Sequence, residues 1–296
     1  MRTAILLMVA VIAVSGRQAQ PAPDVESAVT RLGAYLLEYE KQLSTVIAQE
    51  RYRQSETRPR TGRTSLASGI GSITTRTLES EVAFLRLPGD LEWYGVRNVL
   101  RVNGKPVESS SPRLLDAMQA LAVDRDALIE AIVHASSVHN LGASRTINMP
   151  TVPLELLHPR NRARFSFRLA GTATISRTPT RELRFQEQST PSLVQDVSGR
   201  HLLAEGSVWI EPASGQLWRV VVRFDVAHQS VRHGQTAPNE LRVDFARDAT
   251  LGLMVPKELR EDLQTLGGGR VQGRAMYSQF RRFTTSARIL PPPGAI

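Results

Sequence analysis

The stretch 204–247 carries a clear two-residue alternation of apolar and polar side chains. Within 217–227 the apolar residues occupy every second position, and charged residues such as Arg219 and Arg223 stand between them. A period of two is typical of a β-strand with one buried and one solvated face. The alternation returns over 241–245. We therefore predict successive antiparallel strands of one amphipathic sheet. Its apolar face consists of Trp218, Val220, Val222, Phe224, Leu241, Val243 and Phe245. Helices, the curvature of the sheet itself or a ligand must cover such a face.

Turn signals divide the rest of the chain into further strands. Gly215 supplies the positive φ of a bulged hairpin, and Asn103-Gly104 is the dipeptide most typical of a two-residue hairpin turn. The polar stretch Glu56–Gly71 is predicted to be a hairpin loop. Other strands are predicted from near Thr45 and over 74–87, 92–102, 164–169, 181–188, 253–262 and 273–289.

Helical spacing appears in three places. Asp24 is placed to cap a helix whose apolar residues, from Val25 to Leu43, fall on one face, so this helix must lie on the sheet. Two helices are predicted in an insert over 111–141, followed by Gly142 as a left-handed stop, and a short helix over 151–157. About ten strands with these helices indicate an α+β fold, namely a single strongly curved antiparallel sheet, or half-barrel, partly covered by helices. An all-β sandwich is the alternative.

The first twenty residues have the layout of a secretory signal peptide. Arg2 precedes the apolar run Ala4–Val14, and small residues follow. The run is shorter than a bilayer span requires, although an uncleaved N-terminal anchor is the alternative. We expect residues 1–20 to be removed, residues 21–290 to form one half-barrel domain, and residues 291–296 to be a loose tail. The mature protein is predicted to be periplasmic.

Composition narrows the function further. The chain has no cysteine, which excludes disulfides and thiolate chemistry, and its net charge is +9 with arginine far outnumbering lysine. The planar arginine fork suits phosphate and carboxylate, so an anionic membrane surface is one candidate partner, while solvated strand faces are the simpler explanation. Nucleic acid is not expected, because few aromatic residues interleave the arginines and no binding motif appears.

Two local patterns carry a family resemblance. Residues 206–215 form a strand and a turn with proline and glycine, while 255–261 and 277–283 form C-terminal strands that end in an aromatic-arginine cluster. Together with the order of helix, strands, helical insert and long strand run, they make the chain resemble the LolA-like half-barrel group of periplasmic lipoprotein and lipid carriers. The sensor-regulator RseB shares that fold. The resemblance implies a concave apolar sheet face, partly lidded by helices, that accepts an acyl chain or a lipoprotein.

No motif of catalytic grade appears in the sequence. His134 and His139 would lie about 140° apart around a helix and so would not share a metal ion. Strand glutamates such as Glu187 and Glu258 are candidates for a glycosidase pair, but pairing with arginines explains them better. The nucleophile elbow and the phosphate-binding glycine loop are absent from the sequence. We expect a protein that is not an enzyme and that has no cofactor and no metal.

The stretch 140–150 is the most unusual predicted loop. Asn140, Arg145 and Asn148 either bind a ligand headgroup at the rim of the sheet or hydrogen-bond the loop's own backbone, as asparagine often does. We predict an exported protein that binds a hydrophobic ligand on the apolar sheet face. An envelope interaction or regulatory protein with a filled core is the first alternative, and an unrecognised hydrolase is the second.

Overall fold

The structure is a computed structural model that describes residues 24–59, 70–86, 93–108, 134, 136–142, 145, 147–196, 199–226, 239–264 and 269–282. Three predictions lie wholly or mostly outside these residues: the signal peptide 1–20, the helices of the insert 111–141, and the tail 291–296.

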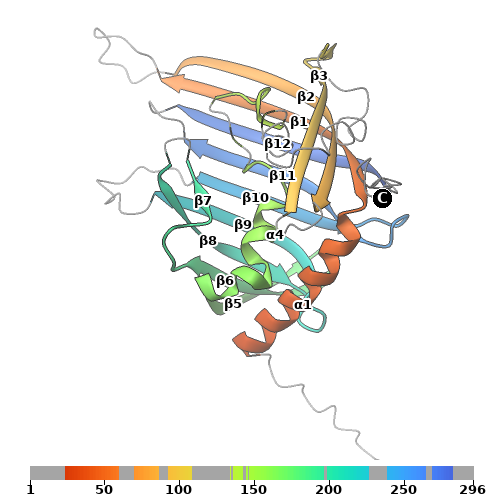
Figure 1. Cartoon of the computed structure of the whole chain (residues 1–296), viewed down its shortest axis with the longest axis vertical. Coiled ribbons are helices and arrows are strands. Elements are labelled where there is room, and N and C mark those ends of the chain that lie inside the picture. Colours follow the sequence, from red (N-terminus) through yellow and green to blue (C-terminus); the bar gives the residue numbers. More distant parts are fainter. Residues whose placement is uncertain are drawn as a thin grey trace, which may run out of the picture.

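One antiparallel sheet of twelve strands organises the chain (Figure 1). The strands run in the spatial order β4-β3-β2-β1-β12-β11-β10-β9-β8-β6-β5, and β7 pairs with β8 beside this path. The two ends of the order are not paired with each other, so the sheet is open. A single open sheet confirms the predicted α+β class and excludes the sandwich. The strands are β1 (Val46–Pro59), β2 (Ile70–Arg86), β3 (Trp93–Val102), β4 (Lys105–Pro106), β5 (Phe165–Ile175), β6 (Thr178–Glu187), β7 (Val194–Gln195), β8 (His201–Ile210), β9 (Leu217–Val226), β10 (Asn239–Arg247), β11 (Met254–Gln264) and β12 (Arg270–Arg282).

The helices lie on one face of this sheet (Figure 1). α1 (Val25–Leu43) begins where predicted, because the Asp24 carboxylate accepts a hydrogen bond of 2.6 Å from the Ser27 backbone N–H. α4 (Val152–Leu157) confirms the predicted short helix, and the 3₁₀ helix η1 (Pro159–Arg164) leads from it into β5. We call the side of the sheet under these helices the covered face and the opposite side the open face.

The structure contradicts both bounds of the predicted loop Glu56–Gly71. Thr57 pairs with Ile73 across the β1–β2 ladder, and the two strands continue to Pro59 and from Ile70. The polar side chains that suggested a loop belong to the strand. Buried Glu56, for example, accepts hydrogen bonds of 3.0 Å from Nε and from Nη2 of Arg58. The backbone N–H and C=O groups of a paired strand form their hydrogen bonds whether the side chains are polar or apolar. The polar side chains of this stretch therefore did not end the strand.

The hairpin between β8 and β9 fixes α1 to the sheet. Gly215 has φ +73°, as predicted, and a Cβ added there would collide with the backbone of Arg31 in α1. The Arg31 guanidinium also donates a 2.8 Å hydrogen bond to the Pro212 carbonyl in the same turn. A glycine is therefore required twice at this position, for its backbone conformation and for the close approach of the helix.

Candidate functional site

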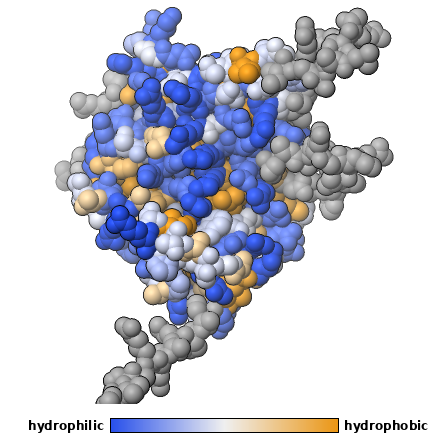
Figure 2. All heavy atoms as spheres, turned by 180° about the vertical axis from the view of Figure 1, so that it is seen from behind, coloured by the Kyte–Doolittle hydropathy of each residue, from blue (hydrophilic) through white to orange (hydrophobic). Residues whose placement is uncertain are grey.

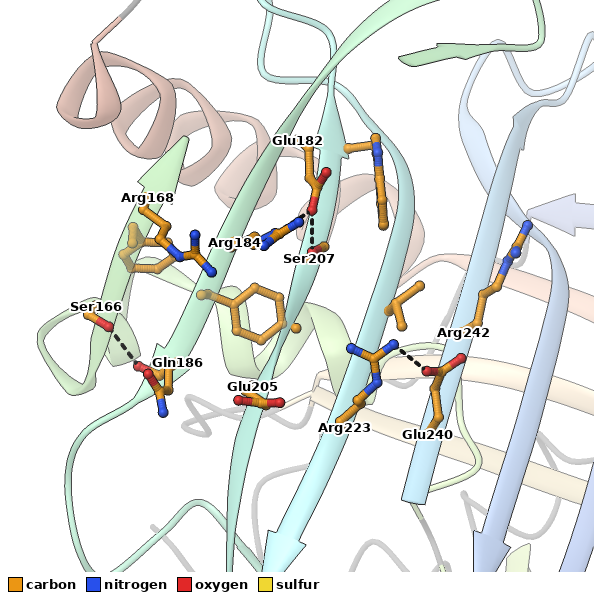
Figure 3. A pocket seen from close by; sticks show the side chains of 15 residues that line it. Ser166, Arg168, Glu182, Arg184, Gln186, Glu205, Ser207, Arg223, Glu240 and Arg242 are labelled. Carbon is orange, nitrogen blue, oxygen red and sulfur yellow. Dashed lines mark hydrogen bonds and ion pairs between the residues drawn. The ribbon is translucent and has the colours of Figure 1, made fainter. Parts of the chain in front are cut away.

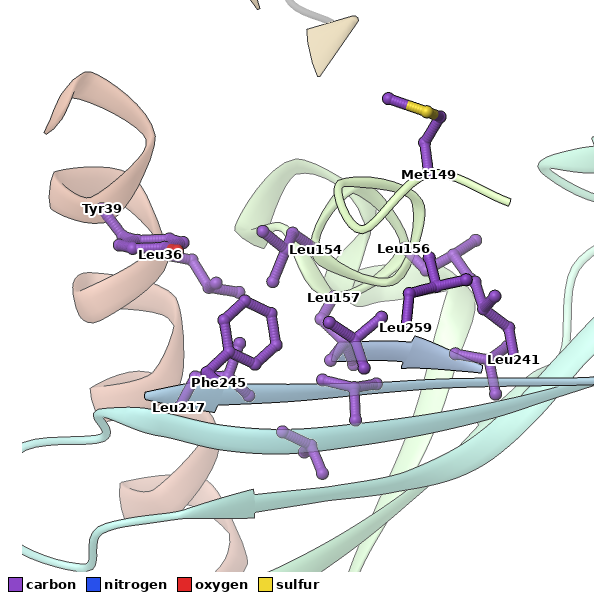
Figure 4. Close-up of a cluster of buried hydrophobic side chains, with 14 of the residues drawn as sticks. Leu36, Tyr39, Met149, Leu154, Leu156, Leu157, Leu217, Leu241, Phe245 and Leu259 are labelled. Carbon is purple, nitrogen blue, oxygen red and sulfur yellow. The ribbon is translucent and has the colours of Figure 1, made fainter. Parts of the chain in front are cut away.

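The seven predicted ligand-binding residues all lie on the covered face. They come from β9 and β10, where Val220 pairs with Val243 and Val222 with Leu241, so their side chains form one continuous apolar surface. Trp218 is 8% exposed and the other six are at most 3% exposed. Leu36 and Tyr39 of α1 and Leu154, Leu156 and Leu157 of α4 belong to the same buried cluster, and Figure 4 shows the helices standing over the strands. The structure thus confirms the shared face, and it places a packed helical cover on it.

Trp218 differs from the other residues of the apolar face by carrying a hydrogen-bond donor. Its indole Nε1–H is buried and has no acceptor in the part of the chain that the structure describes. Trp218 lies beside a β-bulge, because the β8–β9 register shifts between Trp209 and Ile210. At this bulge two successive residues, Leu217 and Trp218, are both buried. A buried donor without an acceptor costs about 1–3 kcal/mol. The apolar face therefore offers one unused donor to a molecule that brings a carbonyl or carboxylate oxygen.

The covered face of β1, β3, β11 and β12 carries buried polar and charged side chains among its apolar residues. Glu50 and Arg97 form a fully buried ion pair with Nε–Oε2 2.6 Å and Nη2–Oε1 2.9 Å. Burial opposes the charge on Arg97, but the charge and hydrogen bonds of Glu50 outweigh it and raise the pKa of Arg97. Arg97 Nη2 also donates to the backbone carbonyl of Asn148 at 3.0 Å. This pair attaches the segment before α4 to the sheet.

The three predicted rim residues meet in the same polar region. Arg145 Nε donates to Glu261 Oε2 at 3.0 Å, Asn148 Nδ2 donates to the Tyr52 hydroxyl at 3.2 Å, and both asparagines are buried. Asn140 Oδ1 accepts from Asn148 Nδ2 at 3.1 Å, and Asn140 Nδ2 donates to the Arg145 carbonyl at 2.9 Å. The two asparagine side chains therefore bind each other, and all three side chains bind strand residues or the backbone of their own segment. They hold the described residues between Asn140 and Asn148 against β1 and β11.

Tyr52 and Glu261 form the centre of this network. The sequence drew attention to Glu261 only as one of several strand glutamates, and it did not identify Tyr52 as a site residue. The Tyr52 hydroxyl donates to Glu261, and burial together with the neighbouring carboxylate raises the pKa of Tyr52. Gln54 adds hydrogen bonds of 2.9 Å to Asn140 Oδ1 and 2.6 Å from the Leu141 N–H. The available signal was in β1, where Glu50, Tyr52 and Gln54 follow Ala48 at every second position on the buried side.

A second polar contact joins the two helical parts of the cover. His158, between α4 and η1, lies 3.2 Å from Glu40 of α1 (Nε2 to Oε2), and both residues are buried. The Arg160 backbone N–H donates to His158 Nδ1 at 3.3 Å, so Nε2 carries the proton of the neutral ring and donates to Glu40. Burial and the nearby Arg160 charge lower the pKa of His158 despite the attraction of Glu40.

The open face carries a groove of about 630 Å³ over β5, β6, β8, β9 and β10. Figure 2 shows this side of the molecule as mainly hydrophilic, and Figure 3 looks into the groove with α1 behind the sheet. Four arginines (Arg168, Arg184, Arg223 and Arg242) and three glutamates (Glu182, Glu205 and Glu240) are among its lining residues. This groove is separate from the predicted apolar site, because the sheet lies between them.

The carboxylates considered for catalysis do not form a site. Glu187 lies on the covered face and accepts from Arg164 at 3.3 Å, whereas Glu258 lies on the open face and accepts from Arg260 at 2.8 Å. The two residues therefore do not face one cleft, as a glycosidase pair must. Among the described residues, no three histidine or carboxylate side chains come together in a group that would hold a metal ion. Neither α1 nor α4, the α-helices whose bounds the described residues give, has the length and apolarity of a membrane span.

Comparisons with known proteins give similarity at the level of the chain path. No family model and no curated protein matches the sequence. A DUF1329 family protein from Desulfovibrio piger matches with TM-score 0.40 and 10% identity, over 88% of this chain and 93% of that one. A putative outer membrane lipoprotein-sorting protein domain from Vibrio parahaemolyticus matches with TM-score 0.34 and 11% identity, over 86% and 93%. The MucA/MucB complex of Pseudomonas aeruginosa matches with TM-score 0.23 and 10% identity, over 86% and 99%. A lipoprotein-sorting domain, the kind of protein that the sequence resembles, is among these matches, at low similarity.

Proposed function

We propose that the protein is an exported, non-enzymatic binding protein of the cell envelope that holds an acyl-bearing ligand between the covered face and its helices. The observation that carries the proposal is the buried Trp218 Nε1–H on an otherwise apolar surface. A ligand with an acyl chain and an ester, amide or acid oxygen supplies both the apolar area and the missing acceptor. Binding of this kind requires no catalytic residue. The signal-like first twenty residues support export, and export in turn supports a periplasmic location.

The helical cover must move for a chain to reach this surface. Leu154, Leu156 and Leu157 of α4 pack onto the strands, and burying three leucines contributes roughly 6 kcal/mol at about 2 kcal/mol each. An acyl chain contributes ~0.8 kcal/mol per buried methylene, so about ten methylenes would yield roughly 8 kcal/mol. The free energy of burying the acyl chain is therefore similar to that of burying the three leucines. A fatty acyl chain of about ten methylenes or more would compensate for displacing the leucines of α4 from the sheet.

An interaction or regulatory protein with a filled core is the second candidate. It is favoured by one observation, namely that the residues of the apolar face are already buried by α1 and α4. In that case the covered face serves stability alone, and a protein partner binds elsewhere on the chain. The two candidates differ in a simple property, because only the first requires the protein to take up a lipid.

Titration with cis-parinaric acid, a fluorescent fatty acid, tests the proposal. We expect saturable binding to the wild type and about a five- to tenfold loss of affinity in Trp218→Phe, which keeps the ring and removes the donor, as expected for one hydrogen bond of about 1 kcal/mol. Trp209→Phe is the matched control, since Trp209 lines the groove on the open face. Absence of binding, or equal losses in the two variants, would refute a site at Trp218.

A further inference from the structure

The open face carries six arginines in one cross-strand line over the sheet. The ladders place Arg53 opposite Arg274, Arg274 opposite Arg260, and Arg260 opposite Arg242. The line continues through Val221 and Ser207 to Arg184, which is opposite Arg168. Adjacent strands lie about 4.8 Å apart, so the six arginines extend over roughly 34 Å. Eight consecutive strands thus contribute one residue each, and only Val221 on β9 and Ser207 on β8 are not arginine.

The groove lies where the two arginines are missing. Ser207 and Val221 have short side chains, and they separate Arg184 on β6 from Arg242 on β10 by three strand spacings, or about 14 Å. Both short residues line the groove, as do the arginines on either side. The cavity therefore exists because small side chains interrupt the arginine line, and cationic groups stand at both of its ends (Figure 3).

Arg168 is the cation that the protein leaves available in this groove. Arg184 donates to Glu182 at 2.8 Å, Arg242 to Asp244 at 2.7 Å, and Arg223 lies 2.9 Å from Glu240. The side chain of Arg168 forms no ion pair or hydrogen bond with the other described residues, although Arg168 lies directly opposite Arg184. Like charges directly opposite each other on a sheet are destabilising. An anion bound between the two guanidinium groups would remove that repulsion and form charge-assisted hydrogen bonds.

Glu205 and the groove floor limit the kind of anion. Glu205 lies in the neighbouring cross-strand row, opposite Arg223, and its side chain has no ion pair or hydrogen bond among the described residues. A free carboxylate accepts hydrogen bonds from hydroxyl groups and repels a second anion. Phe185, Val221 and Trp209 add apolar area to the lining. The arrangement suits one anionic group next to a hydroxylated carbon skeleton.

From these residues we infer that the groove binds a phosphate ester bearing hydroxyl groups, of the glycerophosphate kind, with its phosphate between Arg168 and Arg184 and its hydroxyl groups at Glu205. The same chemistry occurs in soluble glycerol phosphate and in the phosphatidylglycerol headgroup. This site lies on the opposite side of the sheet from the covered face. The inference is therefore independent of the acyl-binding proposal, and either can be refuted without the other.

Calorimetric titration with sn-glycerol 3-phosphate and flotation with vesicles of phosphatidylglycerol or phosphatidylcholine test the inference on the full chain. We expect binding to at least one glycerophosphate source and no binding to phosphatidylcholine vesicles or to glycerol. Binding of the soluble ester alone assigns a soluble ligand, and binding of the phosphatidylglycerol vesicles alone assigns a lipid headgroup. No binding of either source would overturn the inference.

Three variants separate a built site from general attraction of anions to a basic protein. Arg168→Gln removes the free cation, and Val221→Arg completes the arginine line and fills the groove, so each should lower affinity at least about tenfold. Arg53→Gln is the matched control, because Arg53 ends the same line outside the groove. It should leave binding unchanged. An equal loss in Arg53→Gln and Arg168→Gln, or undiminished binding by folded Val221→Arg, would overturn the inference. If one groove variant fails to fold, the other decides.

Discussion

Arg97 and Glu50 form a bidentate ion pair from which solvent is excluded, with both side chains fully buried beneath the segment that leads into α4. β3 supplies the arginine and β1 the glutamate, and the two strands are not neighbours in the sheet, since β2 lies between them. Arg97 Nη1 and Nη2 also donate to the carbonyls of Ser136 and Asn148, at 3.2 Å and 3.0 Å. The pair thereby ties three parts of the chain together.

Removal of one partner of this pair is expected to destabilise the protein strongly. Arg97→Met or Glu50→Gln each leaves a buried charge without its counterion, which costs about 3–5 kcal/mol of the free energy of unfolding. The double variant Glu50→Met with Arg97→Met buries no charge and should lose less than either single variant. Urea denaturation measures all three. Additive losses in the double variant would show that the two charges do not depend on each other.

The contact between His158 and Glu40 predicts a pH dependence of stability. The pKa of His158 is lowered in the folded protein, first by burial and then by the charge of Arg160. In the unfolded chain it is about 6.5, so below that pH the unfolded state binds more protons than the folded state. The free energy of unfolding should therefore fall on acidification from about pH 6.5 towards the lowered pKa of the folded state, and level off below it. Urea denaturation between pH 7.5 and 5.5 measures this slope.

His158→Gln is the control for that slope, because glutamine does not titrate. The pKa of His139 is also lowered, by burial and by Arg76, so the variant should retain a smaller slope from His139. An unchanged slope in His158→Gln would show that His158 does not cause the acid sensitivity.

Gly215 and Gly104 make a matched pair for testing how α1 is attached. Both have positive φ, +73° and +79°, but an added Cβ at Gly104 meets nothing within 4 Å, whereas at Gly215 it meets the backbone of α1, with Leu32 N at 2.7 Å. Gly104→Ala should lose about 1 kcal/mol through backbone strain, and Gly215→Ala should lose clearly more, because the helix must also shift. Thermal denaturation compares them. Equal losses would mean that the helix does not depend on this contact.

Weakening the attachment of residues 140–148 should speed ligand uptake. Arg145→Gln removes the cation that binds buried Glu261, so it should lower stability and raise the rate at which parinaric acid binds, by several-fold. Arg274→Gln is the control, since Arg274 pairs with Glu258 on the open face at an exposed position. Stopped-flow fluorescence measures the rate. A slower or unchanged rate in Arg145→Gln would place the route of access elsewhere.

Local signals made much of the fold predictable. The cap at Asp24, the turn at Asn103-Gly104 and the alternating stripe around Val220 each depend on neighbours in the chain, and the structure has all three. The stripe also identified the apolar face correctly as a surface. The sequence predicted α4 as a short helix but did not predict that its leucines cover the apolar face. Periodicity does not say where a short helix packs.

Long-range register was the information that the sequence did not contain. Glu50 and Arg97 looked like separate strand residues, and Arg145 and Glu261, 116 positions apart, carry no local sign of their contact. The arginine line depends on the alignment of eight strands. Bulges such as those at Asp244/Phe245 and Ile47/Gln49 shift that alignment by single residues, and a one-residue shift moves a side chain to the other face. The arginines are scattered along the sequence, and they form a line only when the strands pair in this register.

Native mass spectrometry of the protein, purified from its own cell envelope without detergent, tests the central claim most directly. The account predicts a one-to-one adduct with the mass of an acyl lipid, which excess fatty acid displaces from the wild type. A bare polypeptide mass, together with no uptake of parinaric acid, would contradict the account and leave the covered face as a filled core.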